Sequence, residues 1–149
     1  MERCDGRWQG IGIAALRWIV GVVFLVHGSQ KLFVYGFHGF AQYLVGAGIP
    51  LASVSAVVVT LVEFLGGIAL ILGALTRWAA ALLAINMAVA VLAVHVKHGF
   101  FLPAGGYEYA LTLLVANLSL MLAGGGVCAL DNLFCRARAP QPEVRPNAA

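Results

Sequence analysis

Charged residues are scarce in this chain of 149 residues, which excludes most classes of soluble protein. Only 10% of the residues are charged, whereas soluble domains average about 25%. Hydrophobic residues make up 62% of the chain, and the mean hydropathy is +0.94. The length allows one domain. These values predict an integral membrane protein, for which the lipid bilayer is the main surrounding.

Cysteines are few, and none of them forms a CxxC pair. Cys4, Cys128 and Cys135 all fall on the side assigned below to the cytoplasm, where disulfides are rare. The spacing of Cys128 and Cys135 would place them on one face if that segment were helical. The sequence nevertheless indicates small apolar fillers or inert thiols rather than a dithiol active site.

Concentrated positive charge and phosphate-binding motifs are also missing. The net charge is +3, but the basic residues are scattered at the ends of apolar runs instead of sharing one face. The glycine-rich segments match neither GxGxxG nor a Walker motif. Binding of nucleic acid or of nucleotide phosphates is therefore not expected.

Long apolar runs are abundant, and they predict an all-α fold, a bundle of four transmembrane helices. The expected spans have the length of bilayer-crossing helices and lie at residues 11–33, 51–75, 78–96 and 107–123. Only Thr76 and Arg77 separate the second span from the third, which predicts a tight antiparallel hairpin. We expect residues 1–10 to be a cytoplasmic N-terminus, residues 11–135 the membrane domain and residues 136–149 a disordered cytoplasmic tail.

Arginine is distributed asymmetrically between the two ends of these spans. Four spans place both termini on one side, and the arginines of the termini and of the 76–77 turn collect there, whereas Lys31 and Lys97 lie on the other side. The positive-inside rule assigns the arginine-rich side to the cytoplasm. Arg17, inside the first span, is expected to reach that interface, with pairing to a carboxylate as the alternative.

Glu63 is the only charged residue of the second span and lies at its centre. A carboxylate at that depth is costly unless it is protonated, paired or hydrated. Asn86 and Asn117 lie near the middle of the third and fourth spans, at a similar depth. These three residues predict a polar cluster at the bilayer midplane.

A second polar group lies toward the outer surface. His27 and Lys31 are four residues apart on one helical face, and Lys31 is close enough to the interface to snorkel. Other polar residues of this group end the third span or open the fourth, and they are His95, Lys97, His98 and Glu108. Such groups suit a quinone head or a proton path, because histidine titrates near neutral pH.

Two other uses of these side chains stay open. Interhelical hydrogen bonds and ion pairs commonly join membrane helices, so the same residues can serve packing alone. A metal site is less favoured, because the only close histidine pair, His95 and His98, has no HExxH or HxxxH context. We therefore predict no metal site.

The order of residues resembles the DoxX family of small four-helix membrane proteins. The resemblance covers roughly residues 13–134 and rests on these residues: Arg17, His27-Gly28, Lys31-Leu32-Phe33, Gly48-Ile49-Pro50, Glu63, Gly66-Gly67, Gly73, Thr76-Arg77, His95, Gly99-Phe100-Phe101, Gly106-Tyr107-Glu108-Tyr109, Gly124, Gly126 and Leu130-Asp131. Where the family often has Ser-Leu-Asp, this chain has Ala129-Leu130-Asp131, so any role of that serine is lost. The loop from Phe101 to Gly106 is also short for the family, which leaves less room for an external partner.

The resemblance implies a multi-pass protein of the bacterial inner membrane, with both termini cytoplasmic, associated with a redox complex. It carries over Arg17, His27, Lys31, Glu63, His95, Glu108 and Asp131 as candidate functional residues. We expect His27, Glu63 and Glu108 to act on a quinone head and its protons, with Arg17, Lys31, His95, Asn86 and Asn117 as further contacts. The sequence has no redox centre of its own, so the protein is at most an oxidoreductase-associated subunit with a redox-protein partner, and a homo-oligomer stays open. The alternative is a non-enzymatic scaffold or small-solute carrier.

Overall fold

A computed structural model describes residues 2–132 of the chain. The predicted tail at residues 136–149 and Cys135 lie outside the described residues. Within the described part the chain is helical and contains no strand, which confirms the all-α membrane bundle. Its elements in chain order are α1 (Glu2–Ser29), η1 (Gln30–Tyr35), α2 (Gly36–Gly46), α3 (Ala52–Leu72), α4 (Thr76–Val89), η2 (Ala90–His95), η3 (Val96–His98), η4 (Leu102–Ala104) and α5 (Glu108–Ala123).

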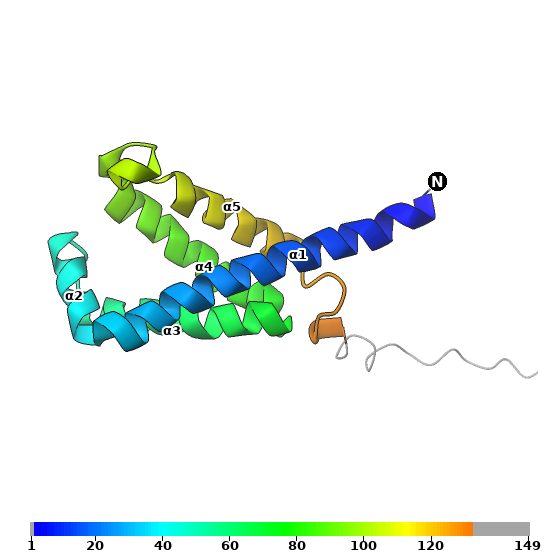
Figure 1. The fold of residues 1–149 in the computed structure, drawn as a ribbon, viewed down its shortest axis with the longest axis horizontal. Coiled ribbons are helices and arrows are strands. Elements are labelled where there is room, and N and C mark those ends of the chain that lie inside the picture. The colour runs from blue at the N-terminus through cyan, green and yellow to red at the C-terminus, as the bar shows by residue number, and fades with distance from the viewer. Residues whose placement is uncertain (1, 133–149) are drawn as a thin grey trace, which may run out of the picture.

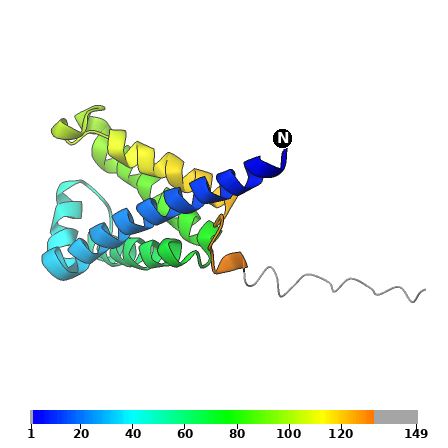
Figure 2. The same ribbon diagram turned by 45° about the vertical axis from the view of Figure 1, so that its right-hand side comes forward.

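The helices pack as two pairs. Helix α1 packs chiefly on α3, and α4 chiefly on α5. The two pairs meet near the α3–α4 turn and separate toward the other end of the molecule, where α2 stands across the opening (Figure 1). The same arrangement is visible after rotation of the molecule (Figure 2). The two pairs thus enclose a wedge-shaped space, and the candidate site lies in this wedge.

Glycines bring the backbones of α1 and α3 into direct contact. A Cβ atom on Gly28 would lie 2.5 Å from the backbone nitrogen of Phe64, and one on Gly67 would lie 2.5 Å from that of Leu25. No side chain fits at these distances, so both positions require glycine. Small residues of this kind allow close packing of membrane helices, whose association depends on van der Waals contact.

The apolar stretches agree with the predicted membrane protein. Within residues 2–132, three helical stretches are long and apolar enough to cross a bilayer, namely Gly6–Gly46, Ala52–Leu72 and Thr76–His98. Helix α5 is apolar but has only 16 residues. The chain is therefore a membrane protein, while the number of passes and the side on which the termini lie stay predictions.

The predicted hairpin is confirmed at the α3–α4 turn. Helix α3 ends at Leu72 and α4 begins at Thr76, so residues 73–75 connect them, whereas the expected connection, Thr76 and Arg77, already belongs to α4. Gly73 and Leu75 adopt left-handed backbone conformations with φ of 69° and 49°. This conformation favours glycine and is uncommon for leucine.

Helix α2 was not predicted from the sequence. It begins at Gly36, whose φ of 66° and ψ of 164° interrupt the helix that precedes it. Phe40, Ala41 and Leu44 form its buried face and pack near α3 with Ala52 and Ala56. This short amphipathic helix covers the open end of the wedge.

Candidate functional site

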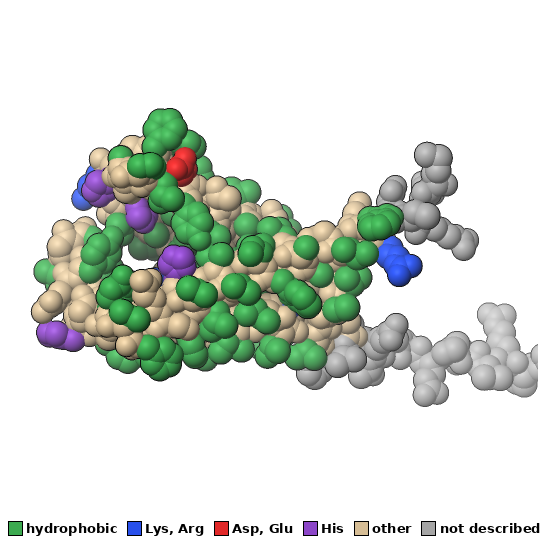
Figure 3. Space-filling model, viewed as in Figure 1, with side chains coloured by type: hydrophobic (Ala, Val, Ile, Leu, Met, Phe, Trp, Pro, Cys, Tyr) green, Lys and Arg blue, Asp and Glu red, His purple; other side chains and the backbone are tan. Residues whose placement is uncertain are grey.

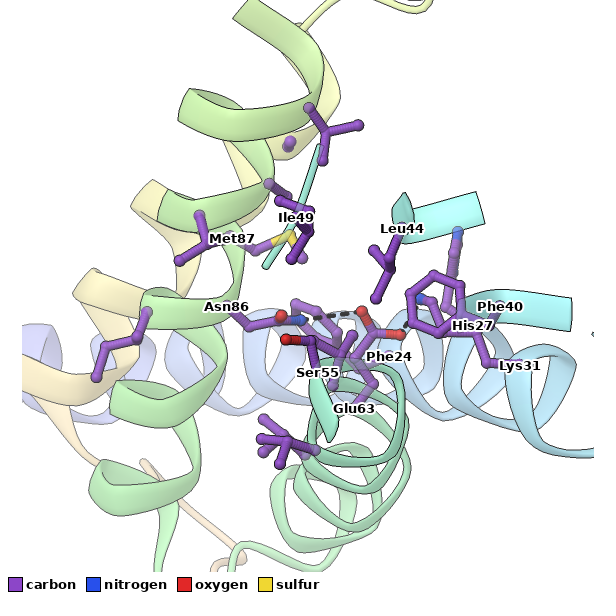
Figure 4. A pocket seen from close by; sticks show the side chains of 18 of the residues that line it. Phe24, His27, Lys31, Phe40, Leu44, Ile49, Ser55, Glu63, Asn86 and Met87 are labelled. Carbon is purple, nitrogen blue, oxygen red and sulfur yellow. Dashed lines mark hydrogen bonds and ion pairs between the residues drawn. The ribbon is translucent and has the colours of Figure 1, made fainter. Parts of the chain in front are cut away.

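The Glu63 carboxylate lies between two partners on neighbouring helices. Its Oε2 forms an ion pair with the Lys31 ammonium of η1 and accepts a hydrogen bond from it. Its Oε1 accepts a hydrogen bond from Nδ2 of Asn86 on α4 at 2.9 Å. Figure 4 shows the three side chains in one row. The side chain of Glu63 is only 4% exposed and that of Lys31 16%. Pairing offsets the cost of placing both charges in an apolar layer.

The pairing of Lys31 differs from the expected geometry. The sequence favoured a lysine that snorkels to the outer interface, but its ammonium turns inward to Glu63. The Lys31 Nζ also lies 5.2 Å from the ring centroid of Phe40 on α2, within the range of a cation–π contact. The outer and midplane polar groups that we expected to be separate therefore share Lys31.

Two π-helical segments border this row of polar side chains. Segment η1 contains Lys31, and η2 leads from α4 to His95. A π-helical turn is wider than an α-helical turn and changes the direction of the side chains that follow it. Such turns occur frequently at functional sites.

A pocket of about 780 Å³ surrounds the three side chains. Its walls are mostly apolar and come from α1, η1, α2, α3, α4, η2 and α5. Figure 4 shows Phe24, Leu44 and Met87 among these walls. Volumes of about 300–1,000 Å³ with few polar groups are typical of cofactor and small-ligand sites.

His27 and His95 line the same pocket. His27 Nδ1 lies 2.9 Å from the carbonyl oxygen of Val23, and His95 Nδ1 lies 2.7 Å from that of Gly105. A carbonyl can only accept, so Nδ1 carries the hydrogen in each ring and Nε2 is left for another group. The His27 ring also lies beside that of Tyr109, with centroids 6.2 Å apart. Histidine side chains are visible at the edge of the hollow (Figure 3).

Asn117 does not join the row of polar side chains. It is fully buried on α5, its Nδ2 donates to the carbonyl oxygen of Leu113 at 2.7 Å, and it does not line the pocket. Its Oδ1 is buried without a hydrogen-bond partner among the described residues. Similar depth predicted a cluster of three, but only Asn86 faces Glu63.

Glu108 also lies outside this pocket. Its Oε1 accepts from the backbone nitrogen of Leu102 at 2.6 Å and thereby fixes the loop before α5. His98 is exposed, and its Nδ1 donates to the carbonyl oxygen of Val94 at 3.1 Å. Of the three residues expected to act on a quinone, the structure brings together His27 and Glu63.

Arg17 is not the exposed, interface-directed side chain that the sequence favoured. It is fully buried, and its guanidinium donates only to backbone carbonyls. The acceptors are those of Leu70, Ile71 at 2.9 Å, Gly125 at 3.0 Å and Cys128 at 3.3 Å. Leu70 and Ile71 belong to the last turn of α3, where the helix dipole favours a cation, and the Leu70 carbonyl also accepts from the Gly73 nitrogen at 3.1 Å. Arg17 therefore joins α1, the end of α3 and the segment after α5, and does not line the pocket.

Asp131 supports the same end of the molecule. Its carboxylate accepts from the backbone nitrogens of Leu75 at 2.7 Å and Thr76 at 2.9 Å, at the start of α4. Ala129, in the place of the family's serine, is buried nearby. Cys128 lies in a turn with φ of 55°, and Cys135 lies outside the described residues, so their shared helical face stays a prediction.

Metal-ligating side chains do not gather in the part of the chain that the structure describes. No group of three or more histidine, cysteine, aspartate or glutamate side chains could hold a metal ion among these residues. His95 and His98 turn to separate backbone carbonyls. The geometry thus directs attention to the pocket around Glu63.

Known proteins match most of the chain. The model of the DoxX family matches residues 12–96. The chain belongs to the DoxX family. That range includes Lys31, Glu63 and Asn86, and thus the whole row of polar side chains.

Two relatives match about four fifths of the chain. An uncharacterized protein of Haemophilus influenzae is 37% identical over 125 residues, which cover 82% of this chain and 90% of that protein. A Bacillus subtilis protein named "Putative oxidoreductase CatD" is 34% identical over 121 residues, 81% of this chain and 85% of that protein. No solved structure matches the chain.

Some residues of the pocket were not among the predicted site residues. They are Phe40, Tyr43 and Leu44 of α2, together with Tyr109 of α5. The i, i+3, i+4 spacing of Phe40, Tyr43 and Leu44 is a helical signal that the sequence does carry. Tyr109 carried a weaker signal, as the residue after Glu108.

Proposed function

We propose that this DoxX-family protein binds the head of a quinone in the pocket around Glu63 and serves a redox partner in the membrane. The observation that supports this most is a paired carboxylate and ammonium, Glu63 and Lys31, at the wall of an otherwise apolar pocket. A few polar groups in an apolar pocket fix the orientation of a ligand. The name of the Bacillus subtilis relative agrees with a redox role.

The residues of the pocket fit a quinone head. A flat ring with carbonyl oxygens requires apolar walls and hydrogen-bond donors. Phe24, Leu44 and Met87 supply walls, while the Lys31 ammonium has three donor hydrogens, of which Glu63 occupies one. His27 Nε2, whose ring is held through Nδ1, supplies a further polar contact.

Each polar side chain would have a distinct part in this site. Glu63 balances the charge of Lys31, so the pair carries no net charge before a ligand enters. Asn86 fixes the orientation of the carboxylate. His27 can exchange a proton with a ligand oxygen through Nε2. The bound quinone supplies the redox chemistry, and the partner supplies the electrons, because the sequence contains no dithiol pair.

The test is quinone extraction from the purified protein, followed by titration of the extracted protein with quinone. We expect bound quinone in the natural chain and weaker binding in His27→Ala. The matched control is His38→Ala, because His38 is exposed, contacts Gln42 and does not line the pocket. Absence of bound quinone, together with no difference between the two variants, would exclude the proposal.

One observation favours a second function, a scaffold or small-solute carrier without enzymatic activity. Both oxygens of Glu63 have partners within the protein, so the carboxylate needs no ligand to be satisfied. Contacts that join η1, α3 and α4 in this way are typical of helix packing. A quinone-free protein that functions normally would support this alternative.

A further inference from the structure

One wall of the pocket also belongs to the surface of the molecule. Val54 and Val58 on α3 and Ile85 and Val89 on α4 line the pocket. These side chains are also exposed, Val58 by 53% and Ile85 by 63%. Because they come from both helices of the hairpin, they border an opening between α3 and α4.

This opening lies at the depth of the polar row. Ile85 directly precedes Asn86 in α4, and Val58 lies five residues before Glu63, about 7.5 Å along α3 at the helical rise. The two helices are joined by a short turn at one end and separate away from it (Figures 1 and 2). In a membrane the opening therefore faces hydrocarbon rather than water.

Apart from Ser55 and Glu63 on α3 and Asn86 on α4, the polar lining of the pocket comes from other elements. His27 is on α1, Lys31 on η1, His95 on η2 and Tyr109 on α5. The side formed by α3 and α4 offers apolar contacts around Val58 and Ile85. A ligand that uses both sides must be amphiphilic, with a polar head and a hydrocarbon chain.

We propose that the pocket takes a chain-bearing lipophile that enters from the bilayer between α3 and α4. Its head lies beside Lys31 and Glu63, and its chain passes Val58 and Ile85 into the lipid. A volume of about 780 Å³ accommodates a head and a short stem but not a long isoprenoid chain. The hydrocarbon chain of the ligand gains no free energy by moving from lipid into the protein, because protein side chains are no more apolar than lipid tails. The identity of the head rests on the proposed quinone function.

Narrowing the opening provides the test. The variants are Ile85→Trp and Val58→Trp, and the control is Leu65→Trp, which is 57% exposed on α3 in the natural chain but does not line the pocket. Each full-length protein is placed in lipid nanodiscs and titrated with long-chain ubiquinone and with its chainless benzoquinone head. We expect the two opening variants to bind ubiquinone at least about tenfold more weakly, and the chainless head within about twofold of the natural protein.

The outcomes separate this inference from the proposed function. If the natural protein binds neither probe, the quinone function fails. If it binds both probes and the opening variants lose neither or lose both equally, the entrance between α3 and α4 is excluded. Val58→Trp and Ile85→Trp lie on different helices, so a folding defect in one leaves the other as a test, with thermal unfolding as the check.

Discussion

Lys31 and Glu63 form an ion pair between a π-helical segment that follows α1 and the middle of α3. The two residues are 32 positions apart in the sequence. Both line a mostly apolar pocket. The pair supplies a partner for a carboxylate that would otherwise be costly in the membrane. The ion pair also determines the effect that a substitution of Glu63 has on stability, because Lys31 would lose its partner.

We expect Glu63→Gln to be destabilising, although glutamine has the same shape. Its oxygen can still accept from Asn86, but its amide group cannot accept from Lys31, which leaves an ammonium without its partner. Removal of one member of a buried ion pair costs about 3 kcal/mol of unfolding free energy. Unfolding in mixed micelles measures this loss.

The control for Glu63→Gln is the double variant with Lys31→Met. It removes the unpaired charge, so stability should recover while quinone binding stays lost. If Glu63→Gln alone is as stable and as active as the natural protein, the ion pair is unimportant for both folding and binding.

We expect Arg17→Lys to destabilise the protein without weakening ligand binding in the molecules that stay folded. A compact ammonium cannot reach four carbonyls spread over the end of α3 and residues 125–128. The carbonyls left without donors cost about 3 kcal/mol. Thermal unfolding in detergent measures the loss, and quinone titration of the folded fraction gives the second reading. A binding defect at full stability would contradict the structural role.

We expect Gly67→Ala to force α1 and α3 apart. The added methyl group would lie 2.5 Å from the Leu25 nitrogen, and overpacking of this kind costs about 1–3 kcal/mol. Gly12→Ala is the matched control, because a Cβ atom there meets nothing within 4 Å. That variant should be neutral or gain up to about 1 kcal/mol through helix propensity. Equal effects of the two substitutions on unfolding would be inconsistent with the close packing.

We expect Ala129→Ser to stabilise the protein. A Cβ atom on Gly125 would lie 2.5 Å from the Ala129 Cβ and 3.0 Å from the Thr76 hydroxyl oxygen, so the Ala129 methyl group and the Thr76 hydroxyl are near each other. The Thr76 hydroxyl oxygen is buried without a hydrogen-bond partner among the described residues. A serine hydroxyl could supply that bond, which is worth about 1 kcal/mol. A rise in the midpoint of thermal unfolding is the expected result, and Ala129→Val, which adds bulk but no hydroxyl, should lower it.

Depth along the membrane was predictable from the sequence, whereas direction around each helix was not. Hydropathy and helical rise placed Glu63 and Asn86 at one level, and they do form a hydrogen bond. The same rule placed Asn117 there as well, but its side chain faces Leu113 of its own helix. Depth alone cannot distinguish these cases, because the sequence does not fix how each helix is rotated toward its neighbours.

The π-helical turns explain the largest difference at the site. The place of Lys31 near the outer end of its span led us to expect a lysine that snorkels to the interface. Segment η1 has a wider turn, and the Lys31 ammonium reaches Glu63 instead. No residue pattern in Gln30–Tyr35 predicts such a turn, so this part of the site required the structure.

The carbonyls that accept from Arg17 are all synthesised after α1. Every acceptor belongs to chain that leaves the ribosome after α1, and two of them, Gly125 and Cys128, follow the last long helix. A newly inserted α1 therefore carries an arginine whose partners do not yet exist. Until residues 125–128 arrive, that arginine must be served by water or lipid head groups. Residues 125–128 thus complete the hydrogen bonding of Arg17 on α1. A chain truncated before residue 125 would keep its hydrophobic segments, but α1 would lack two of the contacts that fix its position.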